Sequence, residues 1–406
     1  MTRDIRLHRW TDLDVKIIEV DGRMSYRDPH TGESAEFDYA TWTSPLVSPG
    51  FAATQIIPSW IARTPPGTWV QVDLRFTTAA GTTTGWYVLG RWAEDGSTIR
   101  RTTVPDQKDT DARVGDDTVF CADGHEASAW QMRVLLLRRA GSGLTPVLHS
   151  AGAVASRVPA RAAGTPAGVA LGSRPPSESG AESAPDSAGS APDVAPASAS
   201  RPALALGRVL PVPQFSQRVH RHQNPEWNGG GGTWCSPTSV SMAAAYWGCP
   251  PDPADYAWVT NDDPWVNEAA GRTYDHAFKG CGNWAFNTAY AGRLGLDGFV
   301  TRLRSLGEVE QFIAAGIPLV LSVSYRAGQV PGADYDTNGH LLMVAGFTAT
   351  GDPVVNDPAA DDNAAVRKVF GRAELEAAWL NASGGVVYVI RPPHRPLPAP
   401  PAQANW

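Results

Sequence analysis

The chain has 406 residues, of which 42% are hydrophobic and 18% are charged. This much apolar material is enough for two or three packed cores, so we expect a soluble protein with several domains. The formal net charge of -7, with only 34 Lys and Arg residues, argues against a nucleic-acid-binding surface, because such a surface needs clustered cations that displace counterions from phosphates.

The beginning of the chain, MTRDIRLHRWTDLDVKIIEV, carries charges throughout the stretch where a signal peptide needs an unbroken apolar segment. No segment reaches the roughly 18 consecutive apolar residues that a membrane helix requires. As written, the sequence therefore predicts a cytoplasmic protein with no membrane insertion.

Short runs of alternating apolar and polar residues dominate the N-terminal region, 1–155. Examples are TWVQVDLRF at 68–76, GWYVLGRW at 85–92 and WQMRVLLLRR at 130–139. This pattern, with turn-forming spacers between the runs, predicts an antiparallel all-β domain with a sandwich-like arrangement.

Tryptophans are frequent in this β domain, and flat aromatic surfaces can stack on a sugar or a peptide. The domain is therefore a candidate binding module, although the sequence indicates no ligand. Because aromatic side chains dominate β cores energetically, we expect most of these tryptophans to be core residues. The six considered are Trp42, Trp60, Trp69, Trp86, Trp92 and Trp130.

A low-complexity segment, 156–206, follows the β domain. Its central part, 173–201, consists almost wholly of Ala, Ser, Pro, Gly and acidic residues. Such a composition cannot bury enough surface to offset the entropy of ordering, so it predicts a disordered linker. The linker leads to a C-terminal domain at 207–395, and we expect 396–406 to form a flexible tail.

The C-terminal domain mixes helical and strand periodicity. Helices are predicted at 237–248, 305–316 and 371–381, and strands at 317–325, 340–350, 352–357 and 385–391. Helices followed by strands in this order predict an α+β domain whose final strands form an antiparallel sheet.

Cys235 is a candidate nucleophile because of its place in the chain. The flexible run NGGGGT ends at Thr233, Pro237 suits a first helical turn, and Gly248 suits a helix end, so Cys235 lies at or just before a helix N-terminus. Unpaired amides and the helix dipole stabilise a thiolate there, and the same amides can bind an oxyanion. A lone Cys is usually a small buried hydrophobe, so its position alone leaves both interpretations open.

A nucleophilic cysteine needs a base, and the base needs an orienting group. His340 begins a predicted strand, and the turn TGD at 350–352 returns the chain to a second strand that ends at Asp357. Adjacent antiparallel strands bring these two ends together. We therefore expect Asp357 to bind one imidazole nitrogen while the other faces Cys235. Taken singly, each residue also fits an ordinary structural role, a solvated strand-end histidine or an Asp-Pro turn.

Two sequence patterns resemble metal-binding sites, but neither is complete. Asp334, Asp336, Asn338 and Gly339 match the first half of a calcium loop, but its twelfth position is Ala345; we interpret the segment as a loop above the active site. His220 and His222 alternate as they would on a strand, with no third ligand nearby, so we expect both to face solvent. No metal or organic cofactor is predicted.

The four cysteines are too few for a disulfide framework, and none are spaced as C-x-x-C. Cys249 and Cys281 could pair in an exported protein, or they could stay reduced as two buried thiols. The sequence leaves this choice open.

Three segments together resemble the C39-like peptidases, a papain-like branch of the cysteine peptidases. They are VPQFSQ at 212–217, GTWCSPTSVSMAAAYWG at 232–248 and GHLLMVAGFTATGDPVVNDPA at 339–359. The resemblance covers only the C-terminal half of the chain, and it implies a papain-like fold for that half.

The resemblance also assigns roles to residues. It implies that Cys235 is the nucleophile, His340 the general base, Asp357 the orienting residue and Gln217 an oxyanion-hole donor, with Gln214 as the rival for the last role. In the bacteriocin-processing members the Gln lies only a few residues before the Cys, whereas a longer segment intervenes here. Nothing in this chain matches the nucleotide-binding motif of the exporters in that group.

The sequence thus predicts a hydrolase that cleaves peptide or other amide bonds through a Cys-His-Asp triad and a thioester intermediate. The expected partner is a peptide or protein substrate, with cell-wall peptide among the candidates. Two alternatives are a catalytically silent binding platform and a different acyl chemistry, such as peptidoglycan amide cleavage or transglutamination. Similar proteins are often exported, which conflicts with the charged N-terminus. The oligomeric state is not predicted.

Overall fold

A computed structural model describes residues 3–158, 200–201 and 204–406. Most of the predicted linker, 156–206, therefore lies outside the described residues. Its C-terminal end is held against the C-terminal domain: Ser200 N donates to Glu376 Oε1 at 2.9 Å, and Arg372 Nε donates to Ser200 O at 2.8 Å. Ala205 is buried.

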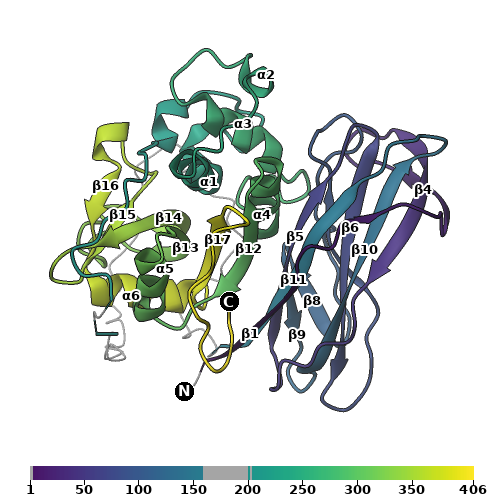
Figure 1. Cartoon of the computed structure of the whole chain (residues 1–406), viewed down its shortest axis with the longest axis horizontal. Coiled ribbons are helices and arrows are strands. Elements are labelled where there is room, and N and C mark those ends of the chain that lie inside the picture. Colours follow the sequence, from purple (N-terminus) through teal and green to yellow (C-terminus); the bar gives the residue numbers. More distant parts are fainter. Residues whose placement is uncertain (1–2, 159–199, 202–203) are drawn as a thin grey trace, which may run out of the picture.

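The N-terminal region forms two antiparallel sheets that face each other (Figure 1). One sheet has the order β1 (Asp4–Trp10), β11 (Val147–Arg157), β5 (Gln55–Arg63), β9 (Thr118–Cys121) and β8 (Ala112–Gly115), with β2 (Val15–Lys16) paired to β11. The other has the order β3 (Gly22–Arg27), β4 (Ser34–Thr43), β10 (Ala127–Arg139), β6 (Thr68–Thr78) and β7 (Tyr87–Trp92). The prediction of a β-rich N-terminal domain is confirmed.

Burial explains this arrangement. Along β10, Met132, Val134 and Leu136 are buried, while the residues between them are partly exposed, as expected for a sheet with one face on a core. Trp60, Trp69, Trp92 and Trp130 are fully buried, which confirms their interpretation as core residues. Trp42 and Trp86 are half-buried instead, and the Trp86 ring lies 4.5 Å from the guanidinium carbons of both Arg75 and Arg133.

The C-terminal domain contains helices and one antiparallel sheet, as predicted. The sheet order is β12 (Asp297–Arg302), β17 (Val386–Arg391), β13 (Leu319–Tyr325), β14 (Thr337–Phe347), β15 (Pro353–Asn356) and β16 (Arg367–Val369). The helices are α1 (Cys235–Tyr246), α2 (Pro253–Tyr256), α3 (Pro264–Thr273), α4 (Trp284–Arg293), α5 (Leu306–Ala314) and α6 (Arg372–Ala382). Three short 3-10 helices complete the domain, η1 (Gln217–His220), η2 (Gly231–Thr233) and η3 (Asn363–Ala365).

Helix α1 lies beside the sheet together with α3, whereas α5 and α6 lie on the opposite side (Figure 1). Ten residues of α1 are buried and most of them are small, so neighbouring elements can approach this helix closely. Ser239 Oγ donates to Leu341 O on β14 at 3.3 Å, and Ser236 Oγ lies 2.9 Å from the Tyr388 hydroxyl on β17. These contacts fix the helix against the strands. In the described residues, no helix has the length and apolar composition to cross a membrane.

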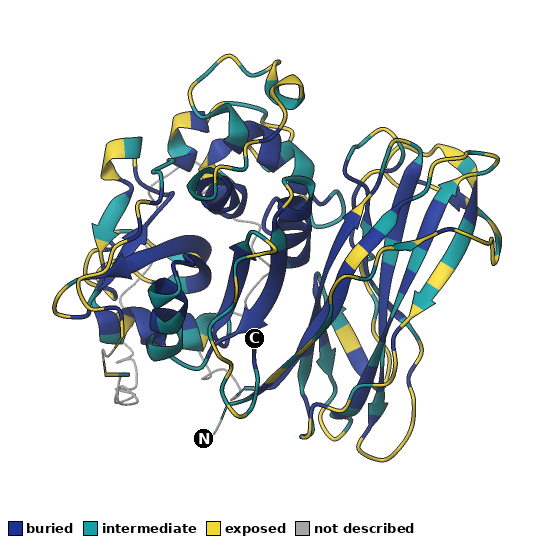
Figure 2. Ribbon diagram, in the orientation of Figure 1, coloured by how far each residue is buried: buried dark blue, intermediate teal, exposed yellow. Residues whose placement is uncertain are grey.

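The two domains share one continuous hydrophobic core (Figure 2). Phe286 on α4 packs edge-on against Trp60, with ring centroids 6.1 Å apart, and contacts Trp92 at 5.5 Å. Glycine permits the close approach: a Cβ at Gly292 would lie 2.5 Å from Ile61 Cγ2. Strand β5 is therefore buried along almost its whole length, on both faces.

The C-terminal residues 396–406 differ from the predicted flexible tail. Asn405 and Trp406 are buried, and the Trp406 ring packs against Phe312 with centroids 5.0 Å apart. Leu7 N donates to Ala404 O at 3.1 Å, and Asn405 Nδ2 donates to Arg302 O at 2.8 Å. Local sequence could not indicate this packing, because the partners lie on distant elements of both domains.

Candidate functional site

Cys235 is the first residue of α1 and is almost completely buried, with 8% of its surface exposed. The helix begins after Trp234, whose side chain makes no capping hydrogen bond. The first N–H groups of a helix have no acceptor within it. Pro237 has no amide hydrogen and Thr238 N donates to Trp234 O, so the N–H groups of Cys235 and Ser236 are the ones without an acceptor in the helix. These amides and the positive end of the helix dipole lie at the residue that carries the sulfur, an arrangement that favours an anion.

His340 and Asp357 lie together, as the hairpin argument predicted. β14 and β15 pair antiparallel, with Met343 opposite Asn356, so the start of β14 meets the end of β15. His340 Nε2 lies 2.8 Å from Asp357 Oδ1. Both side chains are buried, and the Cys235 side chain lies near enough to the same imidazole to help raise its pKa. Because Nε2 contacts the carboxylate, the Nδ1 atom is the one left for the sulfur.

The carboxylate of Asp357 is completely buried and receives several donors. Lys368 Nζ lies 3.0 Å from Oδ2, and both the Tyr335 hydroxyl and Ala359 N donate to Oδ1 at 3.0 Å. Burial alone raises the pKa of Asp357, but the hydrogen bond and charge of His340, with the charge of Lys368, outweigh it and hold the pKa well below the usual range of an aspartate.

The same contacts act on the imidazole. Burial by itself lowers the pKa of His340, but hydrogen bonds to Asp357 and Cys235, together with their negative charges, raise the pKa to about 9. An imidazolium is therefore stabilised between a carboxylate and a sulfur. This arrangement can store a proton next to the sulfur and return it to a leaving group.

Gln217 lies at the start of η1, close to the glycine run that precedes Cys235. Its Nε2 donates to Gly232 O at 2.7 Å, and its buried Oε1 has no hydrogen-bond partner in the described part of the chain. The other candidate, Gln214, points elsewhere: its Oε1 accepts from Arg367 N at 3.1 Å. Of the two glutamines, Gln217 is the one whose side-chain amide contacts the segment leading to Cys235.

Tyr335 was not among the residues that the sequence identified. Its ring lies edge-on to His340, with centroids 5.8 Å apart, and its hydroxyl accepts a hydrogen bond from Tyr325 at 2.6 Å while donating to Asp357. It belongs to the segment ADYDTNGH, in which the calcium-loop pattern and the predicted base involve other residues than the tyrosine. Tyr335 brings this loop over His340 and Asp357. Lys368 on β16 was also missed, and nothing in its local sequence marks it.

The interpretation of His220 and His222 was partly wrong. His222 is exposed, but His220 ends η1 rather than lying on a strand, because Ser216 Oγ accepts from Arg218 N and starts a 3-10 turn. His220 is fully buried, and its Nδ1 lies 3.0 Å from both Gln223 Oε1 and Asn261 Nδ2. Across the described ranges, no group of three His, Cys, Asp or Glu side chains is arranged to hold a metal ion.

The cysteine pairing left open by the sequence has an answer in the structure. All four cysteines lie in the described part of the chain, and all are free. The Cys249 sulfur contacts Trp247 O at 3.6 Å, and the buried Cys281 sulfur contacts Ala270 O at 3.5 Å. Burial raises the pKa of both thiols.

Solved structures that resemble the chain are distant. They include a structure of infectious bursal disease virus Gt strain (12% identity, 37% of this chain and 32% of that chain covered, TM-score 0.20) and an endo-1,4-beta-D-xylanase of Clostridium thermocellum (8% identity, 42% and 32% covered, TM-score 0.19). The chain spans about a third of the length of these structures. Likenesses this weak carry no argument about fold or function.

Family comparisons cover both domains. Residues 2–156 match the peptidase C39 N-terminal domain, and residues 209–387 match the peptidase C39-like family. No curated protein matches the sequence. The C-terminal half of the chain therefore belongs to the peptidase C39-like family, and it follows an N-terminal domain of the kind found in peptidase C39.

Proposed function

We propose that the protein is a cysteine peptidase with a papain-like site, which hydrolyses peptide or other amide bonds. The observation that carries the proposal is the position of His340, whose Nε2 lies 2.8 Å from the buried carboxylate of Asp357 and whose pKa is raised by the nearby Cys235 side chain as well as by Asp357. A nucleophile, a base and an orienting group in contact are what acyl transfer requires. Membership of a peptidase family supports the same reaction class.

The first half of the proposed reaction forms a thioester. His340 holds the proton of Cys235, and the sulfur attacks the carbonyl carbon of the substrate amide to give a tetrahedral oxyanion. The carbon–nitrogen bond then breaks as His340 gives the proton to the leaving amine. Asp357 keeps the imidazole in one orientation and stabilises its charged form throughout.

The oxyanion is proposed to lie between two donors. One is the backbone amide of Cys235 at the start of α1, and the other is Gln217 Nε2, one hydrogen of which is used by Gly232 O while the second has no partner among the described residues. Two donors aimed at the developing charge stabilise the transition state more than the ground state.

The second half of the proposed reaction releases the acid. His340 takes a proton from water, the hydroxide attacks the thioester carbon, and the sulfur leaves as the proton returns to the Cys235–His340 pair. No metal or redox step is needed for this balance. Water is consumed once, and the products are one carboxylic acid and one amine.

The test is product analysis with the full chain. Wild type, Cys235→Ala and the control Cys249→Ala are incubated with a complex peptide mixture and with purified muropeptides, and new termini are identified by mass spectrometry. We expect new amino termini from the peptides with wild type and Cys249→Ala, and none with Cys235→Ala. Turnover that persists in Cys235→Ala contradicts the proposal, and cleavage of muropeptides alone places the reaction in cell-wall amide chemistry.

A further inference from the structure

A cavity of about 470 Å³ lies between the two domains, away from the residues assigned to the reaction. The β domain lines one side and the C-terminal domain lines the other. Its lining residues are His30, Thr31, Arg100, Glu226, Trp227, Tyr274 and His276. This interdomain cleft is large enough for one or two amino-acid side chains.

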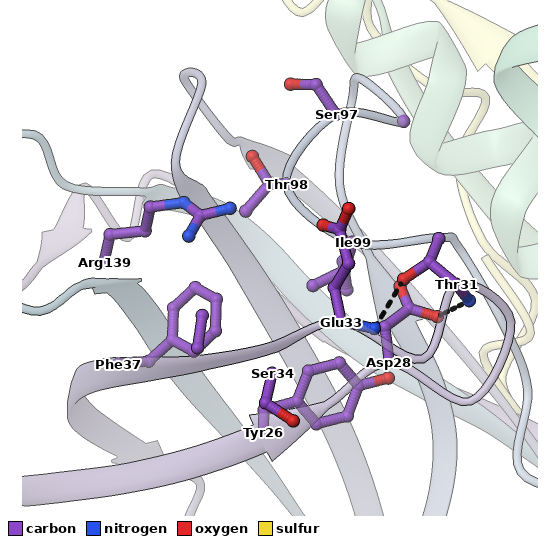
Figure 3. Close-up of a pocket in the computed structure, with 12 residues that line it drawn as sticks. Tyr26, Asp28, Thr31, Glu33, Ser34, Phe37, Ser97, Thr98, Ile99 and Arg139 are labelled. Carbon is purple, nitrogen blue, oxygen red and sulfur yellow. Dashed lines mark hydrogen bonds between the residues drawn. The ribbon is translucent and has the colours of Figure 1, made fainter.

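The β-domain wall of the interdomain cleft is held by one buried carboxylate. Asp28 Oδ1 accepts from the backbone of His30 at 2.8 Å and of Thr31 at 3.2 Å, and its Oδ2 accepts from the backbone of Arg100 at 2.6 Å. Figure 3 shows Asp28 and Thr31 in a smaller neighbouring cavity of about 40 Å³, with Asp28 bonded to Thr31. Asp28 therefore joins two loops that are far apart in sequence.

The opposite wall is fixed to the β domain by backbone contacts. His276 N donates to Arg101 O at 3.0 Å, and the buried Asp275 Oδ1 accepts from Thr103 N at 3.1 Å. Because both hydrogen bonds cross the domain boundary, they fix the distance between the two walls of the cleft.

Two tryptophans connect the wall of the interdomain cleft to Cys235. Trp227 lines the cleft, its carbonyl accepts from Trp234 Nε1 at 2.8 Å, and the two rings lie 6.2 Å apart. Trp234 immediately precedes Cys235 at the start of α1. Trp227 therefore links the wall of the cleft, through the buried Trp234, to the residue at the start of α1.

The chemistry of the cleft favours a carboxylate. In the described part of the chain, the exposed Arg100 guanidinium forms no hydrogen bond or ion pair, and it lines the cleft together with Trp227 and Tyr274. Burial, followed by the positive charges of Arg101 and Arg100, lowers the pKa of His276 to about 4. The field at this wall is therefore positive, although Glu226 adds one negative charge at the rim.

We propose that the interdomain cleft is a substrate subsite, in which Arg100 binds an acidic side chain of a peptide while Trp227 and Tyr274 contact its neighbouring residues. This inference rests on the proposed peptidase function. It gives the N-terminal domain a role in specificity, because two of the three β-domain side chains are histidine and arginine donors.

Binding can be measured without catalysis. Fluorescently labelled random pentapeptide pools with Glu or Gln fixed at the central position are titrated against full-length Cys235→Ala by anisotropy. We expect the Glu pool to bind about fivefold more tightly, a ratio suited to an exposed ion pair. Adding Arg100→Gln should remove the preference, and the matched control Arg6→Gln, at an exposed position on β1, should keep it.

Three outcomes overturn the subsite: equal binding of the two pools, a preference that survives Arg100→Gln, or tight binding of neutral chitohexaose with no binding of either pool. The proposed function fails on a different result, namely that wild type produces no new termini in the product analysis. If turnover is absent and the Arg100-dependent preference remains, the cleft is an acidic-peptide site of a protein that is not a peptidase.

Discussion

Two buried histidines lie near the start of α1, and they differ in what faces their rings. His340 contacts the carboxylate of Asp357 and feels the charge of the nearby Cys235, whereas His220 contacts the amide side chains of Gln223 and Asn261. The pKa of His340 is raised to about 9, and burial lowers the pKa of His220 despite its hydrogen bond to Gln223.

The difference shows that burial does not decide the protonation of a histidine by itself. Burial removes water from both rings and disfavours their charged forms. Only His340 has a buried carboxylate partner, whose attraction outweighs this desolvation and keeps the imidazolium charged. The neutral amides around His220 offer hydrogen bonds but no net charge. The peptidase proposal therefore depends on Asp357 and its donors, and less on the presence of a histidine near Cys235.

The largest expected effect comes from exchanging each histidine for glutamine. His340→Gln should lower kcat/KM by roughly 10³-fold or more, because the proton carrier is lost. His220→Gln should stay within about tenfold of wild type, because His220 bonds to the side chains of Gln223 and Asn261 and has no role in the proposed proton transfer. Steady-state kinetics on a peptide identified by product analysis measures both, with circular dichroism as the folding control. Equal losses would falsify the distinction between the two histidines.

Gln217 lies on the same 3-10 helix as His220, and it sharpens the comparison. Gln217→Ala should reduce kcat by about 100-fold with a smaller change in KM, the pattern for a donor that acts in the transition state. Gln214→Ala should stay near wild-type kcat, because Gln214 bonds to Arg367 N and not to the glycine run. The reverse ranking of the two variants assigns the oxyanion donor to Gln214.

The two histidines should also give opposite signs in the pH dependence of stability. The raised pKa of His340 contributes stability that is fully present below about pH 6.5 and is lost as the pH rises through about 9, to an upper bound of ~3 kcal/mol. The lowered pKa of His220 means that the unfolded chain binds more protons, so stability is lost as the pH falls below about 6.5.

Guanidinium unfolding at pH 5, 6.5 and 9.5 measures this prediction. Relative to wild type, His340→Gln should lose less stability between pH 6.5 and 9.5, and His220→Gln should lose less between pH 6.5 and 5. Asp357 acts in a lower range: its depressed pKa contributes stability above about pH 4 that disappears on further acidification. Identical pH profiles in the two glutamine variants contradict the electrostatic account.

The smallest expected effect is at Tyr335. Tyr335→Phe removes one hydrogen bond to Asp357 and should lower kcat/KM by about fivefold, in line with ~1 kcal/mol for a neutral donor. The ring remains to pack against His340, so a positioning role predicts that the alkaline limb of the kcat/KM profile also shifts. Tyr39→Phe, a tyrosine on β4 of the other domain, is the control. An unchanged pH profile limits Tyr335 to packing.

Sequence patterns within a few residues of one another predicted the helix start and the hairpin that carry the site residues. The helix start at Cys235 follows from the glycine run, Pro237 and Gly248, and the pairing of β14 with β15 follows from a short turn. These features placed His340 and Asp357 together before any tertiary contact was known. Gln217 came from the family resemblance and not from spacing.

Long-range contacts could not be predicted in the same way. Lys368 reaches Asp357 from β16, and Trp406 reaches Phe312 from the chain end, and neither contact has a local signal. His220 was misread because alternation with His222 suggested a strand, whereas Ser216 begins a 3-10 turn. The packing of Phe286 against Trp60 could not be predicted, because the sequence pattern around a tryptophan in a β strand is the same whether solvent or a helix covers the outer face of the sheet.

The most direct test of the central claim is the rate at which iodoacetamide alkylates each cysteine between pH 5 and 9, followed by mass spectrometry in wild type and His340→Gln. Burial raises the pKa of Cys121 to about 11 and also raises that of Cys249 and Cys281, so these three thiols should react slowly. We expect Cys235 to be alkylated fastest of the four cysteines across this pH range, and to lose this reactivity in His340→Gln. If Cys235 reacts no faster than the other three, or if its reactivity is independent of His340, the paired thiolate and imidazolium do not exist and the peptidase proposal is wrong.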